Sequence, residues 1–269
     1  MRLVVLVVAA AICVGTPAAA GPRVGHLTAS RDGWHADLSF LKRRGSFPLA
    51  SHFHLVVRAD KRLVLDAPVT SSLRGVGNEF QPLTLSFRDL NEDGSKELVL
   101  SLFTGGAHCC TFDQVFDFSG AKPRKTEFDF ADSGATIEVL GGKVVFATRD
   151  DSFGYVFTDF ADSGFPIAFH AYDRGRFTDV TRDYPALVAR DAAYWWKQYR
   201  ARLQPRDDVR GILSAWAADE SLLGHATAAK QRLARIAANG ALAYGFGPPK
   251  GRTYLRQLWR FLAQAGYLH

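Results

Sequence analysis

Oxygen-bearing side chains recur at alternate positions in the segment 89–97. They are Asp89, Asn91, Asp93, Ser95 and Glu97. Gly94 stands in sixth place, where a tight loop must turn sharply. Hard cations such as Ca²⁺ bind about six to eight oxygens, which alternate residues of such a loop can supply. The segment therefore predicts a structural Ca²⁺ site formed by four side chains and the Ser95 carbonyl. The alternative is a solvated acidic turn with no ion.

The surroundings of this loop exclude an EF-hand. The twelfth loop position of an EF-hand is a glutamate, and here it is Leu100. The flanks, 83–87 and 98–103, are short runs of Leu, Val, Thr and Phe that are typical of strands rather than helices. We therefore expect the loop to join two strands.

The order strand, Asp-x-Asn-x-Asp-Gly-x-x-Glu, strand resembles the calcium loop of FG-GAP and VCBS repeats, which are β-propeller units of integrin-like and secreted bacterial proteins. The continuation 102–110 also resembles a segment of exported bacterial proteins that carry such a loop. The resemblance covers Leu83–Phe116. It implies a structural Ca²⁺ held between hairpin strands, although no second copy of the acidic ladder is present to indicate a complete propeller.

Two adjacent cysteines, Cys109 and Cys110, follow this segment. Free thiols are disfavoured in an oxidising compartment, so a disulfide between these neighbours is one expectation. One alternative is an intermolecular disulfide or a reduced pair, and a pair that changes between these states would act as a thiol-redox site. Another is a metal site shared with His108. Cys110 and His108 are also two residues apart, so on a strand both would face the same side as a candidate thiol–imidazole pair.

Other candidates for catalysis are few. His52 and His54 would share one face of a strand and could bind a transition metal together with His108 or His170. The alternative is a pair of half-exposed surface histidines. The sequence contains no His-Glu-x-x-His, no Gly-x-Ser-x-Gly and no phosphate-binding glycine loop. Catalytic residues therefore stay unassigned.

The first twenty residues have the pattern of a secretory signal peptide. A basic start at Arg2 precedes the apolar run 3–14, a Thr-Pro break and the small residues 18–20. Cleavage after Ala20 predicts a secreted or periplasmic protein with no transmembrane segment left. The alternatives are an uncleaved anchor or a lipid on Cys13, but the run is shorter than the roughly 20 residues of a spanning helix.

The elements that position these residues follow from composition and periodicity. The chain has 269 residues, of which 47% are hydrophobic and 22% charged, which is typical of a globular protein. Short strand-like runs separated by turns predict an antiparallel β-rich domain over 21–184, as a sandwich, barrel or propeller-like arrangement. Apolar residues at three-and-four spacing predict a helical bundle over 185–269. The fold class is therefore α+β.

These observations favour an exported bacterial calcium-binding β protein with a non-catalytic binding or structural role. The alternatives are an extracytoplasmic hydrolase or metal-dependent enzyme, with its site between the β and helical parts, and a thiol-redox protein. The ligand and partner are unknown. The net charge is +6, and the basic residues of the helical region could contact a cell-envelope polymer, but we interpret them as a solvated helix surface. Nucleic acid is not expected for an exported chain.

Overall fold

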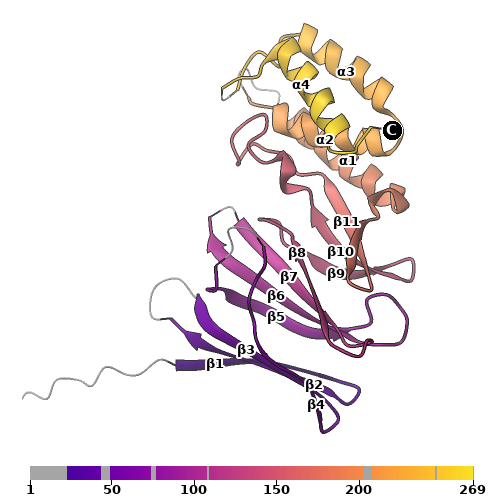
Figure 1. Ribbon diagram of the computed structural model, residues 1–269. Coiled ribbons are helices and arrows are strands. Elements are labelled where there is room, and N and C mark those ends of the chain that lie inside the picture. The colour runs from indigo at the N-terminus through magenta and orange to yellow at the C-terminus, as the bar shows by residue number, and fades with distance from the viewer. Residues whose placement is uncertain are drawn as a thin grey trace, which may run out of the picture.

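Strands and helices occupy separate parts of the chain in the computed structural model, which describes residues 23–43, 49–73, 77–107, 109–202, 207–245 and 247–268, without the side chain of Cys109. In these ranges, twelve strands precede four α-helices (Figure 1). The signal peptide predicted over 1–20 lies outside the described residues.

Each of three sheets is an antiparallel meander of four consecutive strands. The first contains β1 (Arg23–Arg31), β2 (Trp34–Lys42), β3 (Ala50–Ala59) and β4 (Arg62–Pro68). The second contains β5 (Gln81–Arg88), β6 (Glu97–Gly106), β7 (Cys109–Asp117) and β8 (Arg124–Asp129). The third contains β9 (Thr136–Leu140), β10 (Lys143–Arg149), β11 (Ile167–Asp173) and β12 (Arg176–Asp179). A four-stranded sheet is also the unit of a β-propeller.

The sheets are stacked with the second in the middle (Figure 1). Alternate residues of β6 point to opposite faces, and both faces are buried. Leu98, Leu100 and Leu102 are fully buried in a core shared with the first sheet. Val99 lies in a separate core shared with the third sheet. Burial on both sides explains why this strand is an almost unbroken apolar run.

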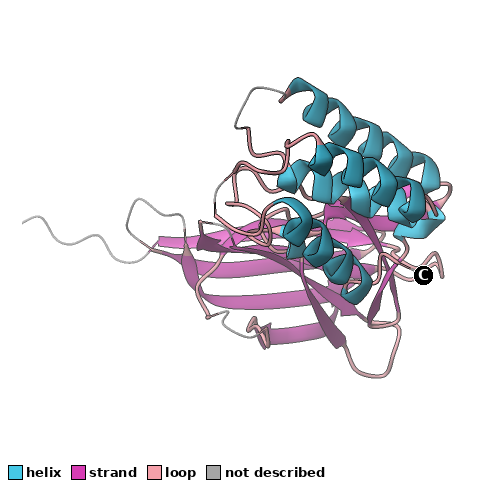
Figure 2. Cartoon of the chain, turned by 90° about the horizontal axis from the view of Figure 1, so that it is seen from above, coloured by secondary structure: helices cyan, strands magenta, loops and turns pink. Residues whose placement is uncertain are grey.

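The helices form a group on one side of the sheet stack (Figure 2). They are α1 (Pro185–Ala201), α2 (Arg210–Leu222), α3 (Ala226–Ala238) and α4 (Gly251–Gln264). Their apolar stripes meet in one core with the 3₁₀ turn η1 (Asp151–Phe153). A second 3₁₀ turn, η2 (Thr181–Asp183), connects β12 to α1. The predicted α+β class, with antiparallel strands followed by helices, is confirmed.

The hexapeptide Asp-Phe-Ala-Asp-Ser-Gly occurs twice, at 129–134 and 159–164, but the two copies are not a structural repeat. The first copy links the second sheet to the third, whereas the second lies between η1 and β11 within the third sheet's connections. There the chain passes so close to α2 that a Cβ added at Gly211 would lie 2.1 Å from the carbonyl oxygen of Asp162. The same six residues therefore occupy two different structural contexts.

Candidate functional site

The acidic loop predicted at 89–97 joins β5 to β6. It turns at Gly94, whose φ of +88° lies in the left-handed region that favours glycine. Three backbone N–H groups donate to side-chain oxygens within the loop. The pairs are Gly94 to Asp89 Oδ2 (3.1 Å), Asp93 to Asn91 Oδ1 (3.3 Å) and Ser95 to Asp93 Oδ1 (2.8 Å). These bonds hold the three side chains against the backbone of their own loop.

Two carboxylates of the loop have oxygens withdrawn from water. Glu97 is 2% exposed and accepts a 2.8 Å hydrogen bond from the N–H of Leu90. Burial, with smaller contributions from the charges of Asp93 and Asp117, raises the pKa of Glu97 to about 7. Asp89 Oδ1 is buried and has no hydrogen-bond partner among the described residues. A bound cation would satisfy such an oxygen, so the donor set fits a hard metal ion.

The loop side chains do not gather into a complete metal site. Within the ranges that the structure describes, no group of three or more His, Cys, Asp or Glu residues is arranged to hold a metal ion. Hydrogen bonds from the hydroxyl and N–H of Ser95, and from Asn91, lower the pKa of Asp93. The five predicted ligands therefore share one loop, and their binding of Ca²⁺ stays a prediction.

The same loop contacts the third sheet. Glu92 forms an ion pair with Lys143 at 3.1 Å and accepts a 3.3 Å hydrogen bond from the N–H of Val144. The amide of Asn91 donates to Asp173 across 3.4 Å, and Leu90 lies in the core that the second and third sheets share. The conformation of the loop is thus coupled to the packing of these two sheets.

Cys110 is 8% exposed and takes part in a disulfide. Its backbone N–H donates to the hydroxyl of Thr104 across 2.8 Å. The side chain of Cys109, with which a bond was predicted, lies outside the described atoms, as does His108. A disulfide-bonded Cys110 is not a thiolate nucleophile in this state. The pairing with Cys109 stays a prediction.

The histidine pair of β3 and the candidate His170 lie on different sheets. His54 forms an exposed 2.6 Å contact with Asp66 on the neighbouring strand, and His52 has a positive φ of 55° at an exposed position. His170 lies on β11 of the third sheet, and His108 is outside the described residues. The structure therefore gives no support to a transition-metal site on β3.

A cavity of about 330 Å³ lies where the third sheet meets the helical region, and we call it the junction pocket. Its lining comes from the end of β8, from β10, β11 and η2, and from the chain after α4. The lining includes titratable and aromatic side chains that could bind or transform a ligand. They are Phe128, Asp150, Asp151, His170, Asp179 and Tyr267. The position corresponds to the one proposed above for an unrecognised enzyme site.

Several titratable groups of the junction pocket are perturbed. Burial lowers the pKa of His170, although the charges of Asp179 and Asp150 oppose the shift. Asp179 is the neighbour of His170 in the β11–β12 ladder. The hydroxyl of Tyr267 donates to Asp150 across 2.7 Å, and burial is the main reason that the pKa of Tyr267 is raised. A neutral imidazole next to carboxylates can accept a proton, so the arrangement permits acid–base chemistry.

Sequence reasoning did not find the junction pocket because residues as distant as Phe128 and Tyr267 form it. The one signal was the adjacent pair Asp150-Asp151, a pattern typical of caps and turns. Asp150 does cap η1 by accepting a 2.9 Å hydrogen bond from the N–H of Ser152. Only the fold shows that both carboxylates also face a cavity.

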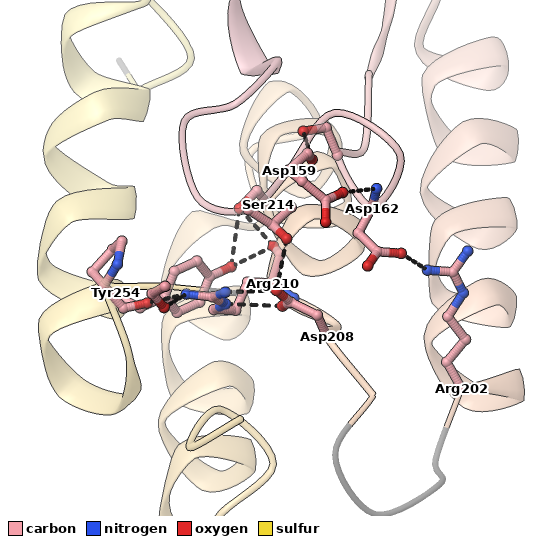
Figure 3. A network of polar contacts seen from close by, with 11 residues as sticks. Asp159, Asp162, Arg202, Asp208, Arg210, Ser214 and Tyr254 are labelled. Carbon is pink, nitrogen blue, oxygen red and sulfur yellow. Dashed lines mark hydrogen bonds and ion pairs between the residues drawn. The ribbon is translucent and has the colours of Figure 1, made fainter. Parts of the chain in front are cut away.

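A second polar network lies inside the helical region (Figure 3). Arg210 is fully buried and donates to both carboxylate oxygens of Asp208. It also donates to the carbonyl of Gly247 at 3.0 Å and to that of Pro249 at 2.5 Å. The hydroxyl of Tyr254 donates to the Arg210 carbonyl at 2.9 Å. These hydrogen bonds join the groups of the network to one another, so among the described residues the network serves to position α2.

Comparisons with known proteins give two partial similarities. The chain is 30% identical over 134 residues to the uncharacterized protein y4bJ of Sinorhizobium fredii. The aligned region covers 48% of the chain and 21% of that protein. The chain is 27% identical over 165 residues to the probable thylakoid lumen protein sll0997 of Synechocystis, which covers 58% of the chain and 48% of that protein. The chain thus spans about a fifth and about half of these relatives. No family model and no solved structure matches, so the comparisons assign no family.

Proposed function

We propose that this chain is an exported bacterial β protein that a structural Ca²⁺ ion stabilises and that has a non-catalytic binding or structural role. The observation that carries the calcium proposal is the buried Asp89 Oδ1, which has no partner among the described residues, in the same loop as the buried Glu97. A hard cation would satisfy the first group and stabilise the charged form of the second.

The expected ligands are the side chains of Asp89, Asn91, Asp93 and Glu97 and the carbonyl of Ser95. By neutralising these carboxylates, the ion would rigidify the loop whose Leu90 and Glu92 contact the third sheet. Its effect would therefore extend beyond the loop to the packing between the second and third sheets. This is a structural role, and it requires no open coordination position.

The proposed compartment rests on two observations. The signal-like segment 1–20 predicts export, and one partial relative is named as a probable thylakoid lumen protein. Among the described residues, no helix is long and apolar enough to cross a membrane. We therefore assign the chain to a space outside the cytoplasm, secreted or periplasmic.

Calcium binding is tested by thermal unfolding. Added Ca²⁺ at 2 mM should raise the melting temperature by several degrees relative to chelator, because a ligand that binds only the native state stabilises it by about 3–4 kcal/mol at 100–1,000 times its Kd. Asp93→Ala and Asp89→Asn should abolish the increase. Asp66→Asn, which changes an exposed aspartate of β4 in the first sheet, is the matched control and should keep it. Equal melting temperatures with Ca²⁺ and with chelator would contradict the proposal.

The junction pocket supports a second candidate, an extracytoplasmic hydrolase that uses acid–base chemistry. The favouring observation is a half-buried His170 between Asp150 and Asp179 in a cavity. We expect hydrolysis of p-nitrophenyl acetate, phosphate or glucoside to fall at least about 100-fold in His170→Asn, the usual loss for a general base. His35→Asn, on the first sheet, should retain full activity. No turnover of any of these substrates by the wild type would exclude this candidate for these three bond types.

A further inference from the structure

A groove with a water-accessible volume of about 1,020 Å³ separates part of the second sheet from the third. It is larger than the roughly 300–1,000 Å³ of ordinary small-molecule sites. One wall is the outer face of β5, β6 and β7, and the opposite wall is formed by residues 133–137 and by the ends of β10 and β11. An opening of this size accommodates several units of a chain molecule.

The wall formed by the second sheet is polar because of strand alternation. Most residues of β5, β6 and β7 that face the first sheet are apolar and lie in the shared core, with Gln114 as a buried polar exception. Several of their alternate neighbours line the groove and carry hydroxyl or charged groups, whereas Leu83 and Val99 add apolar surface to the same wall. In the register of the sheet, Thr84 is opposite Ser101, and Ser101 is opposite Asp113. These three residues form a continuous polar row across three strands, and all of them line the groove.

Asp113 is the centre of this row. Its side chain is only 3% exposed, and Ser101 is the hydrogen-bonding neighbour of its carboxylate. Asp113 Oδ1 is buried and has no partner among the described residues. Burial raises the pKa of Asp113 to about 6, so the group is ionised in most molecules at neutral pH. A ligand hydroxyl that donates to Oδ1 would replace the water that this oxygen otherwise requires.

The charge of the groove favours a neutral ligand. Apart from Asp113, its charged lining residues are Arg88 and Arg149. The guanidinium of Arg149 donates hydrogen bonds to Asp191 and to the carbonyl of Phe165. The Asp191 carboxylate, which does not line the groove, neutralises its charge. Arg88 is exposed, and its positive charge offsets the negative charge of Asp113 in the net charge of the lining. The remaining lining alternates Ser and Thr hydroxyls with apolar side chains such as Ile137 and Ile167.

Backbone pairing argues against an extended peptide as the occupant. A peptide that adds to a sheet requires unpaired N–H and C=O groups on an edge strand. The polar row of the groove lies mainly on the faces of β6 and β7, whose backbones are already paired on both sides, although the edge strands β5 and β9 also contribute to the lining. This wall therefore offers side-chain hydroxyls and a carboxylate. A sugar ring carries hydroxyl groups on its rim and C–H groups on its faces, which match the two kinds of lining.

We propose that this groove binds a neutral glycan chain, with Asp113 and Ser101 as acceptors and donors for its hydroxyl groups. The proposal extends the binding role suggested above, and it does not depend on calcium, since neither Asp89 nor Glu97 lines the groove. The two proposals can therefore fail separately.

The test is isothermal titration calorimetry of the mature protein with chitotetraose, cellotetraose and mannotetraose, each up to 5 mM. At least one should bind, and Asp113→Asn should weaken it at least tenfold. This variant keeps the side-chain shape and removes a buried charge, so it should fold. Ser86→Tyr places a large ring on the groove face and should abolish binding, whereas Thr28→Tyr, on an exposed position of β1, should not.

Three outcomes would overturn the proposal. They are the absence of binding to all three tetrasaccharides, equal binding by the wild type and both groove variants, and tight binding of an alanine–serine decapeptide in place of the sugars. Asp89→Asn should bind the same tetrasaccharide as the wild type. Its melting response to Ca²⁺ then reports on the calcium site alone.

Discussion

Replacing Arg210 by methionine should destabilise the folded protein by about 3–5 kcal/mol, the usual loss when one partner of a buried ion pair is removed. The fully buried guanidinium neutralises Asp208 and satisfies the carbonyls of Gly247 and Pro249. Methionine fills a similar volume but leaves the buried Asp208 carboxylate without the guanidinium that neutralises it, while the Thr158 hydroxyl still donates to it. Equilibrium urea unfolding, followed by tryptophan fluorescence, measures the difference.

A matched control is present in the same region. Arg202 pairs with Asp162 at 2.7 Å, but both side chains are more than a third exposed (Figure 3). Arg202→Met should therefore change the free energy of unfolding by less than about 1 kcal/mol, as exposed ion pairs do. The double variant Asp208→Asn/Arg210→Met should recover part of the loss, because it removes the stranded charge. A loss below about 1 kcal/mol in Arg210→Met would show that the buried pair is not essential.

Replacing Asp219 by asparagine should stabilise the protein at alkaline pH. The side chain of Asp219 is fully buried in α2. Among the described residues, no group donates a hydrogen bond to either of its carboxyl oxygens. Burial, followed by the charge of Asp191, raises its pKa to about 10. A protonated Asp219 donates to Asp191, which itself accepts bonds from Arg149 and from the Trp195 ring N–H.

The direction of the pH dependence follows from this raised pKa. The folded protein holds a proton on Asp219 that the unfolded chain releases above its ordinary pKa of 3.8. The stabilisation is therefore complete below about pH 4 and is lost progressively as the pH rises toward 10, by on the order of 1 kcal/mol per pH unit. Asparagine carries no ionisable proton and can donate to Asp191 at every pH. The variant should match the wild type near pH 4 and exceed it by roughly 3 kcal/mol or more at pH 8.

Urea unfolding at pH 5, 6, 7 and 8 measures these slopes. Glu138→Gln changes an exposed carboxylate of β9 in the third sheet, and its slope should equal that of the wild type. Glu97, Asp113 and Asp151 also have raised pKa values, but they are present in all three proteins and cancel in the comparison. Parallel profiles for the wild type and Asp219→Asn would contradict a protonated Asp219.

Local sequence determined the elements of this fold because their signals involve neighbouring residues. Gly141 and Gly142 are adjacent glycines between β9 and β10, and their φ values of +59° and +86° are those that a tight hairpin turn requires. The apolar stripes of the four helices predicted their buried faces, and Gly240 and Gly266 end α3 and α4 with positive φ. Strand alternation and helical periodicity arise from sterics within a few residues, which a single sequence records.

The environment of individual charges was decided only by tertiary packing. The basic cluster near the first two helices was interpreted as a solvated surface, yet Arg210 is fully buried among carbonyls that follow it by more than thirty residues. Asp208, just before α2, accepts a 3.2 Å bond from the N–H of Arg210 as well as the bonds from its guanidinium. A charged residue has the same identity inside and outside a core, so its sequence position does not reveal its partners.

The same reason separates the candidate sites. The acidic loop 89–97 is continuous in the chain, and its sequence was sufficient to predict a loop between two strands, whereas its binding of a cation stays a prediction. The groove and the junction pocket combine residues from the second and third sheets, and the junction pocket adds the chain after α4, so no local pattern predicts them. By itself, the sequence determined the strands, the helices and the acidic loop. The stacking of the sheets placed Asp113 in a groove and His170 in a pocket, because only packing brings distant segments within hydrogen-bonding distance.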